Sequence, residues 1–180
     1  MYYYIHGYLS DPNSTKGLLL KEKLGVEPIK YRDCKPEDLI ISECVGNILD
    51  EIKNDSNPVL FGSSLGGFLS VLTAIKNPKI KQLILMNPAI IHPSIDILRI
   101  KDMPQRILKE MYKPGLFNEK IDVDIFILVG TLDDVVPNEW VIEFAKAQEA
   151  TVMFLKDDHS FANKLFELPN IFSNILNKKH

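Results

Sequence analysis

The sequence has few of the features that tie a chain to an oxidising compartment or to a membrane. Its 180 residues include only two cysteines, Cys34 and Cys44, which are too few and too isolated for a disulfide framework or a zinc site. No apolar run approaches bilayer length, and the N-terminus lacks the basic start and long apolar core of a signal peptide. We therefore expect a cytoplasmic protein without a membrane partner.

An excess of positive charge is missing as well. The 21 lysine and arginine residues are outnumbered by 24 acidic residues, which gives a formal net charge of -3. Such a balance does not attract polyanions, so we expect no nucleic acid partner. The hydrophobic content of 46%, with 25% charged residues, is typical of a globular protein, and we expect a single domain over residues 1–180. The sequence leaves the oligomeric state open.

Strand-like and helix-like patterns alternate along the chain, which predicts an α/β fold around a mostly parallel sheet. Apolar residues recur at helical spacing in a helix expected to begin near Pro36, and Asn138 is expected to cap a later helix. A last helix with an apolar face is expected after a break at Pro169. About six strands are expected, over residues 2–5, 28–31, 59–61, 82–86, 125–129 and 151–155.

Residues 88–120 interrupt this alternation with about thirty residues that lack a strand pattern, and we expect an inserted helical lid there. Two prolines bracket a short amphipathic helix that carries Leu108 and Met111 on its apolar face. One interpretation is that these two side chains line a substrate pocket, since an insertion after this strand would overhang the sheet edge where ligands bind. The alternative is that the helix packs on the core.

The strongest functional motif is a strand that runs into G-x-S-x-G and then into a helix-compatible pattern, with Ser64 at its centre. A serine at a sharp strand-to-helix turn has a strained backbone and needs small neighbours, which explains Gly62 and Gly66. The motif predicts a nucleophile elbow in which Ser64 is the nucleophile. Short glycine and serine patterns also occur in ordinary connections, so the prediction depends on the residues downstream.

A serine hydroxyl needs a base within hydrogen-bond reach and a carboxylate to orient that base. His159 follows the last predicted strand, and it is the histidine placed correctly with respect to both partners. Asp133 follows the preceding strand and is the preferred acid; Asp134 is the alternative, and either could be a turn residue. The order of serine, aspartate and histidine along the chain is that of the α/β hydrolases.

The loop after the first predicted strand supplies the second part of the expected site. The backbone N–H groups of Tyr8 and Leu65 are expected to bind a developing oxyanion. Gly7 allows the loop backbone to approach closely, and the His6 side chain is expected to brace the loop; an ordinary tight turn is the alternative interpretation. No pair of histidines has the spacing of metal ligands, so we expect no metal.

Several short motifs spread over nearly the whole chain point to a known family. They are Tyr4-Ile5-His6-Gly7-Tyr8-Leu9-Ser10, Pro12, Ser14, Lys16, Gly62-Ser63-Ser64-Leu65-Gly66-Gly67, Asn87-Pro88-Ala89, Asp133, His159 and Phe161. In these motifs the sequence resembles the small YqiA-type esterases of the α/β-hydrolase superfamily. The resemblance implies a minimal α/β-hydrolase fold, a Ser-Asp-His triad without a metal or organic cofactor, and carboxylesterase activity on short acyl esters or thioesters. The chain departs from the family at Asp157 and Asp158, and residues 88–120 match it poorly.

The resulting hypothesis is a serine esterase that takes a small-molecule acyl ester or thioester and forms an acyl-enzyme. One alternative is an acyltransferase or thioesterase that uses the same triad. In an acyltransferase the acyl group passes to a thiol, an amine or peroxide instead of water, because the lid and pocket choose the acceptor. Another is a hydrolase-like scaffold that binds without turnover. An intact set of serine, aspartate and histidine argues against the scaffold.

Overall fold

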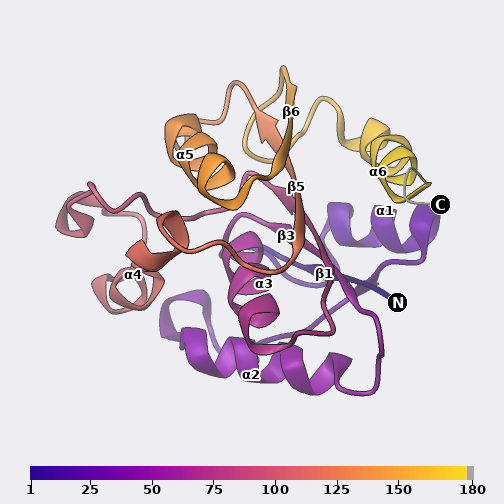
Figure 1. Ribbon diagram of the computed structural model, residues 1–180, viewed down its shortest axis with the longest axis horizontal. Coiled ribbons are helices and arrows are strands. Elements are labelled where there is room, and N and C mark those ends of the chain that lie inside the picture. The colour runs from indigo at the N-terminus through magenta and orange to yellow at the C-terminus, as the bar shows by residue number, and fades with distance from the viewer. Residues whose placement is uncertain (178–180) are drawn as a thin grey trace.

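A sheet of six parallel strands lies at the centre of the computed structural model, which describes residues 1–177 (Figure 1). The strand order is β2-β1-β3-β4-β5-β6, so the chain runs from β1 outward to β2 and returns to the other side of β1 at β3. The carboxyl ends beside such a reversal form a crevice for ligands. The strands are β1 (Tyr2–Ile5), β2 (Glu27–Pro28), β3 (Val59–Ser63), β4 (Gln82–Met86), β5 (Asp124–Gly130) and β6 (Thr151–Leu155).

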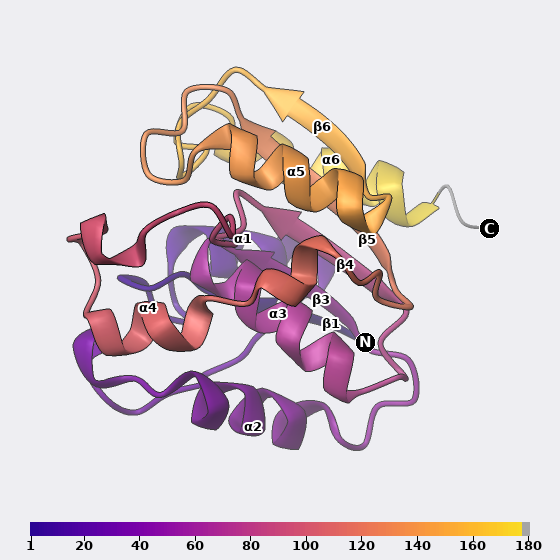
Figure 2. The same cartoon turned by 60° about the vertical axis from the view of Figure 1, so that its left-hand side comes forward.

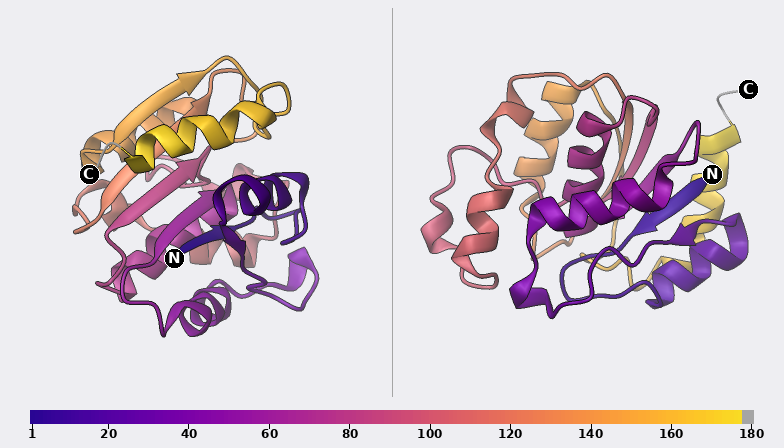
Figure 3. Two further views of the ribbon diagram at one scale, coloured as in Figure 1. Left: turned by 90° about the vertical axis from the view of Figure 1, so that its right-hand side faces the viewer. Right: turned by 90° about the horizontal axis from the view of Figure 1, so that it is seen from below.

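Helices cover both faces of this sheet. Helices α1 (Thr15–Leu24) and α6 (Leu168–Asn177) lie together on one face, while α2 (Ile41–Ile52), α3 (Leu65–Lys76) and α5 (Asn138–Gln148) cover the other (Figure 1, Figure 3). Within residues 1–177, no helix is long and apolar enough to cross a bilayer. The remaining helices are α4 (Gln105–Met111) and the short 3-10 helices η1 (Pro36–Asp38), η2 (Ile97–Arg99), η3 (Pro114–Phe117) and η4 (Leu165–Glu167).

Two apolar clusters fill the spaces between the sheet and its helix layers. The smaller cluster lies under α1 and α6, where Phe172 packs edge to face on Phe61 of β3 with 5.5 Å between ring centroids. Ile171, Ile175 and Leu176 of α6 pack against the same cluster. The larger cluster contains the apolar stripe of α2 that helical spacing predicts, and all of its members are buried: Ile41, Cys44, Val45, Ile48 and Ile52.

Five of the six predicted strands are confirmed with bounds within two residues, and the second one is wrong in its extent. The sequence predicts a strand over residues 28–31, whereas β2 spans Glu27–Pro28. Beyond Pro28 the chain turns to cover the loop that follows β1. Tyr31 is fully buried there, and its hydroxyl donates a hydrogen bond to the carbonyl oxygen of His6 at 3.1 Å.

Three predicted helix signals act differently from expectation. Pro36 starts the 3-10 turn η1, so α2 begins only at Ile41. Asn138 is the first residue of α5 instead of its cap, and its buried Oδ1 atom has no hydrogen-bond partner within the described chain. Pro169 lies in the first turn of α6, where proline is tolerated, so the break expected there does not occur.

Residues 88–120 form an irregular segment that contains η2, α4 and η3. Its first part, residues 88–104, lies on the same side of the molecule as the loop that follows β5 (Figure 2). The apolar face of α4 packs inward: Leu108 is 3% exposed and Met111 is 2% exposed, and both belong to the larger apolar cluster. Their burial is the packing that the second interpretation describes, and neither side chain lines the two cavities described below.

Candidate active site

Ser64 occupies a single-residue turn between β3, which ends at Ser63, and α3, which begins at Leu65. Its backbone has φ 54° and ψ −120°, a region that costs a non-glycine residue about 1–3 kcal/mol. The turn is tightly enclosed. A methyl group on Gly62 would lie 2.5 Å from the carbonyl oxygen of Gly66, and one on Gly66 would lie 2.0 Å from that of Ile5. Both glycines are therefore required by close backbone contact, as the motif predicts.

The structure joins His159 to Asp133 and leaves Asp134 exposed. The Nδ1 atom of His159 lies 2.8 Å from Oδ2 of Asp133, whose side chain is 1% exposed. The other carboxylate oxygen of Asp133 accepts hydrogen bonds from the backbone N–H groups of Val135 at 2.8 Å and Val136 at 3.0 Å. With Nδ1 bonded to the carboxylate, the Nε2 atom of His159 is left free to accept a proton.

The loop after β1 lies directly against the nucleophile. A methyl group on Gly7 would lie 3.3 Å from Cβ and 3.8 Å from Oγ of Ser64, so the backbone at Gly7 faces the serine side chain. The N–H groups of Tyr8 and Leu65 donate to no protein acceptor within residues 1–177. The Ser64 hydroxyl likewise has no hydrogen bond to a described protein group, including His159. Catalytic hydrogen bonds are often long in free enzymes and shorten when substrate is bound.

Tyr31 and Arg32 hold the carbonyl groups of this loop, and the sequence alone does not reveal them. The Tyr31 hydroxyl donates to the carbonyl oxygen of His6, and the Arg32 guanidinium donates to those of Tyr8 at 2.7 Å and Ser10 at 2.9 Å. Each carbonyl shares a rigid peptide group with the N–H of the next residue, so these bonds fix the peptide groups on either side of the Tyr8 N–H and hold the loop backbone around it. The two residues follow β2 and carry no local motif.

The His6 side chain packs against the loop that follows β1. Its ring stacks on Tyr31 with 4.3 Å between centroids, and its Nδ1 atom lies 2.9 Å from the carbonyl oxygen of Gly7. Burial lowers the pKa of His6 to about 4, and this effect is larger than the opposite effect of its hydrogen bond to the Gly7 carbonyl. The neutral ring then donates from Nδ1, because a carbonyl oxygen can only accept.

Asn87, which the sequence analysis names only within a family motif and without a role, contacts the histidine loop. It follows β4 with φ 43°, and its side-chain amide donates to the carbonyl oxygens of His159 at 3.0 Å and Asp158 at 3.4 Å. Its Oδ1 atom accepts a hydrogen bond from the N–H of Gly130 at 2.8 Å. Asn87 thereby ties the histidine loop to the ends of β4 and β5. Its place directly after a buried strand is a signal that could have identified it.

The two acidic residues before His159 hold the backbone of their own loop. Asp157 is fully buried and accepts hydrogen bonds from the N–H groups of Asp158 at 2.9 Å and Lys164 at 2.7 Å. Asp158 accepts from the N–H of Ser160 at 2.9 Å. Neither carboxylate is hydrogen-bonded to the His159 ring within the described chain. The two carboxylates that depart from the family pattern therefore stabilise the loop that carries His159.

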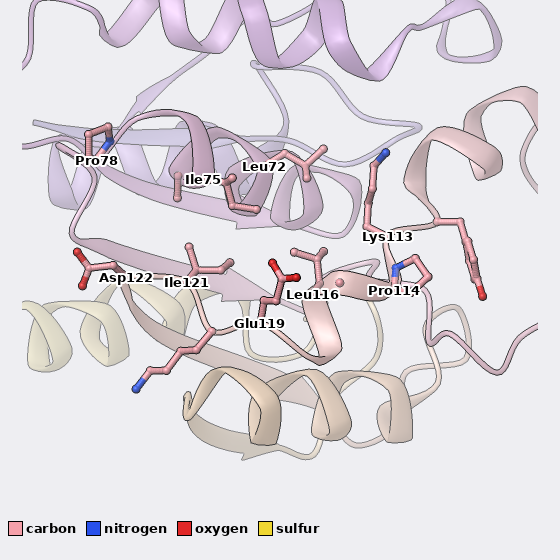
Figure 4. A pocket seen from close by; sticks show the side chains of 13 residues that line it. Leu72, Ile75, Pro78, Lys113, Pro114, Leu116, Glu119, Ile121 and Asp122 are labelled. Atoms are coloured by element: carbon pink, nitrogen blue, oxygen red, sulfur yellow. The ribbon is translucent and has the colours of Figure 1, made fainter.

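Two cavities lie apart from this site. One of about 540 Å³ lies between α3 and residues 112–122, where Leu72 and Ile75 face Leu116 and Ile121 (Figure 4). Another of about 500 Å³ lies along residues 98–105. Neither is lined by the serine, the aspartate or the histidine. Within residues 1–177, no group of three or more histidine, cysteine, aspartate or glutamate residues is arranged to hold a metal ion.

Solved structures of the same fold were found among α/β hydrolases. Est1E from Butyrivibrio proteoclasticus with ferulic acid bound is 20% identical, with a TM-score of 0.81, over 98% of this chain and 87% of that chain. Alpha/beta hydrolase domain-containing protein 10 from mouse is 20% identical, with a TM-score of 0.77, over 99% and 90%. Monoacylglycerol lipase from Paleococcus ferrophilus is 17% identical, with a TM-score of 0.75, over 97% and 92%. At these identities the likeness establishes the fold.

The family model named "Uncharacterised protein family (UPF0227)" matches residues 1–174. A comparison with curated proteins gave no significant match. The six-stranded parallel sheet flanked by helices agrees with the fold that the sequence predicts. The chain therefore belongs to the UPF0227 family, the YqiA family, and has the α/β-hydrolase fold.

Proposed function

We propose that the protein is a serine hydrolase that cleaves small carboxylic acyl esters or thioesters. One observation carries the proposal: the strained Ser64 faces a loop with unpaired N–H groups, and a bonded His159 and Asp133 pair follows two further strands of the same parallel sheet. The similar structures support the class of reaction, because they include a protein crystallised with ferulic acid and a monoacylglycerol lipase.

The proposed reaction proceeds in two steps. Ser64 Oγ attacks the acyl carbonyl while Nε2 of His159 takes the hydroxyl proton, and the N–H groups of Tyr8 and Leu65 stabilise the oxyanion. His159 then donates that proton to the departing alcohol or thiol, which leaves an acyl group on Ser64. Water attacks the acyl-enzyme, with His159 as base, and releases the acid. The Asp133 carboxylate orients the imidazole and stabilises its protonated form.

Labelling with a fluorophosphonate tests the proposal directly, because this probe phosphonylates an activated serine. We expect covalent attachment at Ser64, mapped by peptide mass spectrometry, together with turnover of p-nitrophenyl esters from acetate upward. Ser63, whose side chain is buried against Lys16, is expected to stay unlabelled. A folded protein that takes up no label would support a binding scaffold. A rate that rises when thiols or amines are added would identify an acyltransferase.

The clamp on the loop after β1 gives a second prediction. Changing Arg32 to Met removes the donor to the Tyr8 and Ser10 carbonyls, so the loop backbone that follows the Tyr8 N–H is held less firmly and the N–H is less well aligned. One oxyanion donor is worth about 10²- to 10³-fold in kcat, and partial loss of its alignment is expected to lower kcat about tenfold. Steady-state hydrolysis of p-nitrophenyl acetate measures this change.

The matched control is Arg99→Met, because Arg99 is an exposed arginine on η2 that pairs only with Asp96 within the described chain. Its kcat is expected to equal that of the unmodified protein. Equal kcat for the Arg32 and Arg99 variants would show that the guanidinium of Arg32 does not align the loop.

A further inference from the structure

Lys16 of α1 contacts both halves of the proposed active site from the face of the sheet that carries α1 and α6. Its Nζ atom donates a hydrogen bond to Oγ of Ser63 at 3.1 Å and lies 5.4 Å from the centroid of the Phe161 ring. Ser63 directly precedes the nucleophile, and Phe161 lies two residues after His159. A single ammonium group therefore links the serine turn to the histidine loop.

Both segments that Lys16 contacts have strained backbones. Ser64 has φ 54°, and Phe161 has φ 58°. Conformations of this kind persist only where the surrounding structure holds them. The Phe161 side chain is fully buried, so its ring cannot move away from the ammonium, and a desolvated cation above an aromatic ring is more strongly held than an exposed one.

The surroundings of Lys16 do not resemble those of a surface lysine. Part of its stem is exposed, yet its amino group is withdrawn from solvent between α1, the end of β3 and the histidine loop. Within residues 1–177, no carboxylate oxygen lies close enough to Nζ of Lys16 to form an ion pair, for which the limit is 4.0 Å. Burying an ammonium group without an ion pair is costly, so packing alone does not explain the arrangement.

We propose that Lys16 is a positioning residue that sets the separation of Ser64 and His159 by holding Ser63 and Phe161 together. The inference rests on the proposed function. Lys16 touches neither the substrate nor the reacting atoms, and it acts through the residues beside them. Its loss should therefore lower kcat while KM stays nearly constant, because the position of the reacting groups changes and the binding surface does not.

The titration of Lys16 predicts a change in the pH dependence of kcat, which a purely structural residue would not cause. Burial lowers the pKa of its amino group to about 8, although Asp158 and Asp157 act in the opposite direction. The hydroxyl of Tyr4 also faces Ser63, but burial raises its pKa to about 12, so it stays protonated over this range. As the pH rises through about 8, Lys16 loses the charge that holds Phe161, and kcat is expected to fall.

The test compares Lys16→Met, which keeps the length of the side chain and removes its charge, with Lys23→Met on the same helix. Lys23 is exposed and pairs with Glu22, so its variant is expected to match the unmodified protein. The Lys16 variant is expected to have a kcat about 10- to 100-fold lower at pH 7, with KM unchanged within about twofold. Its kcat should lack the fall near pH 8, and at higher pH it should stay at or below that of the unmodified protein, whose neutral amine still donates to Ser63.

Ser63→Ala removes the hydrogen-bond acceptor and provides a second route if the Lys16 variant does not fold. It should lower kcat in the same direction, and the double variant should be no worse than the Lys16 variant alone, as expected for coupled groups. A Lys16 variant with unchanged kcat and an unchanged pH profile would overturn the inference alone. An unmodified protein that neither takes up fluorophosphonate nor hydrolyses esters would overturn the proposed function and this inference with it.

Discussion

Replacing Ser64 with alanine is expected to lower kcat/KM for ester hydrolysis by about 10⁴- to 10⁶-fold, which is the scale observed when a triad nucleophile is removed. The change deletes one oxygen from a side chain that makes no hydrogen bond within the described chain. The fold is therefore expected to be retained, with a free energy of unfolding within about 0.5 kcal/mol of the unmodified protein. Progress curves with p-nitrophenyl acetate and a urea denaturation curve measure the two quantities.

The matched control for this variant is Ser42→Ala, which removes an exposed hydroxyl from the first turn of α2. It should leave kcat/KM unchanged. Combining Ser64→Ala with His159→Ala should cost no more than the serine change alone, because the two groups act as a unit. A Ser64 variant that keeps more than about a tenth of the activity would place the nucleophile elsewhere.

Replacing Gly66 with alanine is expected to have the largest effect on stability, of about 3 kcal/mol or more. The added methyl group would lie 2.0 Å from the carbonyl oxygen and 2.5 Å from the carbonyl carbon of Ile5, and 2.6 Å from the carbonyl oxygen of His6. These are backbone atoms at the end of β1, which cannot rotate away as a flexible side chain can. Helix α3 must move from the strand, so the loop after β1 also shifts relative to Ser64 and ester turnover falls.

Gly46→Ala is the matched control for this change. Gly46 lies inside α2, and a methyl group there would meet nothing within 4 Å. Alanine is a better helix former than glycine, so this variant is expected to be more stable by about 0.5–1 kcal/mol. Urea denaturation of both variants gives the comparison. Equal changes in the free energy of unfolding would show that the contact between α3 and β1 does not require glycine.

The sequence predicts those parts of the fold that are encoded by local pattern. Strands β4 and β6 have the predicted bounds because continuous apolar runs mark them, and the buried stripe of α2 follows from helical spacing. The serine turn is predictable because a strained serine backbone needs glycines at fixed offsets. The pairing of Asp133 with His159 also agrees with the preferred choice of acid, since both residues follow neighbouring strands of one parallel sheet.

The residues to which sequence analysis gave no role make contacts between distant segments. Arg32 contacts Tyr8, and Asn87 contacts His159, so neither role has a local pattern. The predicted extent of β2 is wrong for a similar reason. The burial of Tyr31 against the loop after β1 overrides the strand propensity of residues 29–31. The two interpretations of Leu108 could not be separated because an apolar helix face looks the same whether it meets substrate or core.

Because α6 is the last element of the chain, one face of the sheet receives the last part of its cover from the C-terminal helix. Every strand precedes α6 in the chain, yet Phe172 of that helix packs on Phe61 of β3. The six strands can form all their hydrogen bonds while this face of the sheet, which includes Ile84 and Phe126, is still exposed to water. A folding intermediate that lacks α6 would expose an aromatic surface to other chains. Residues 168–177 thus complete the cover of this face that α1 begins.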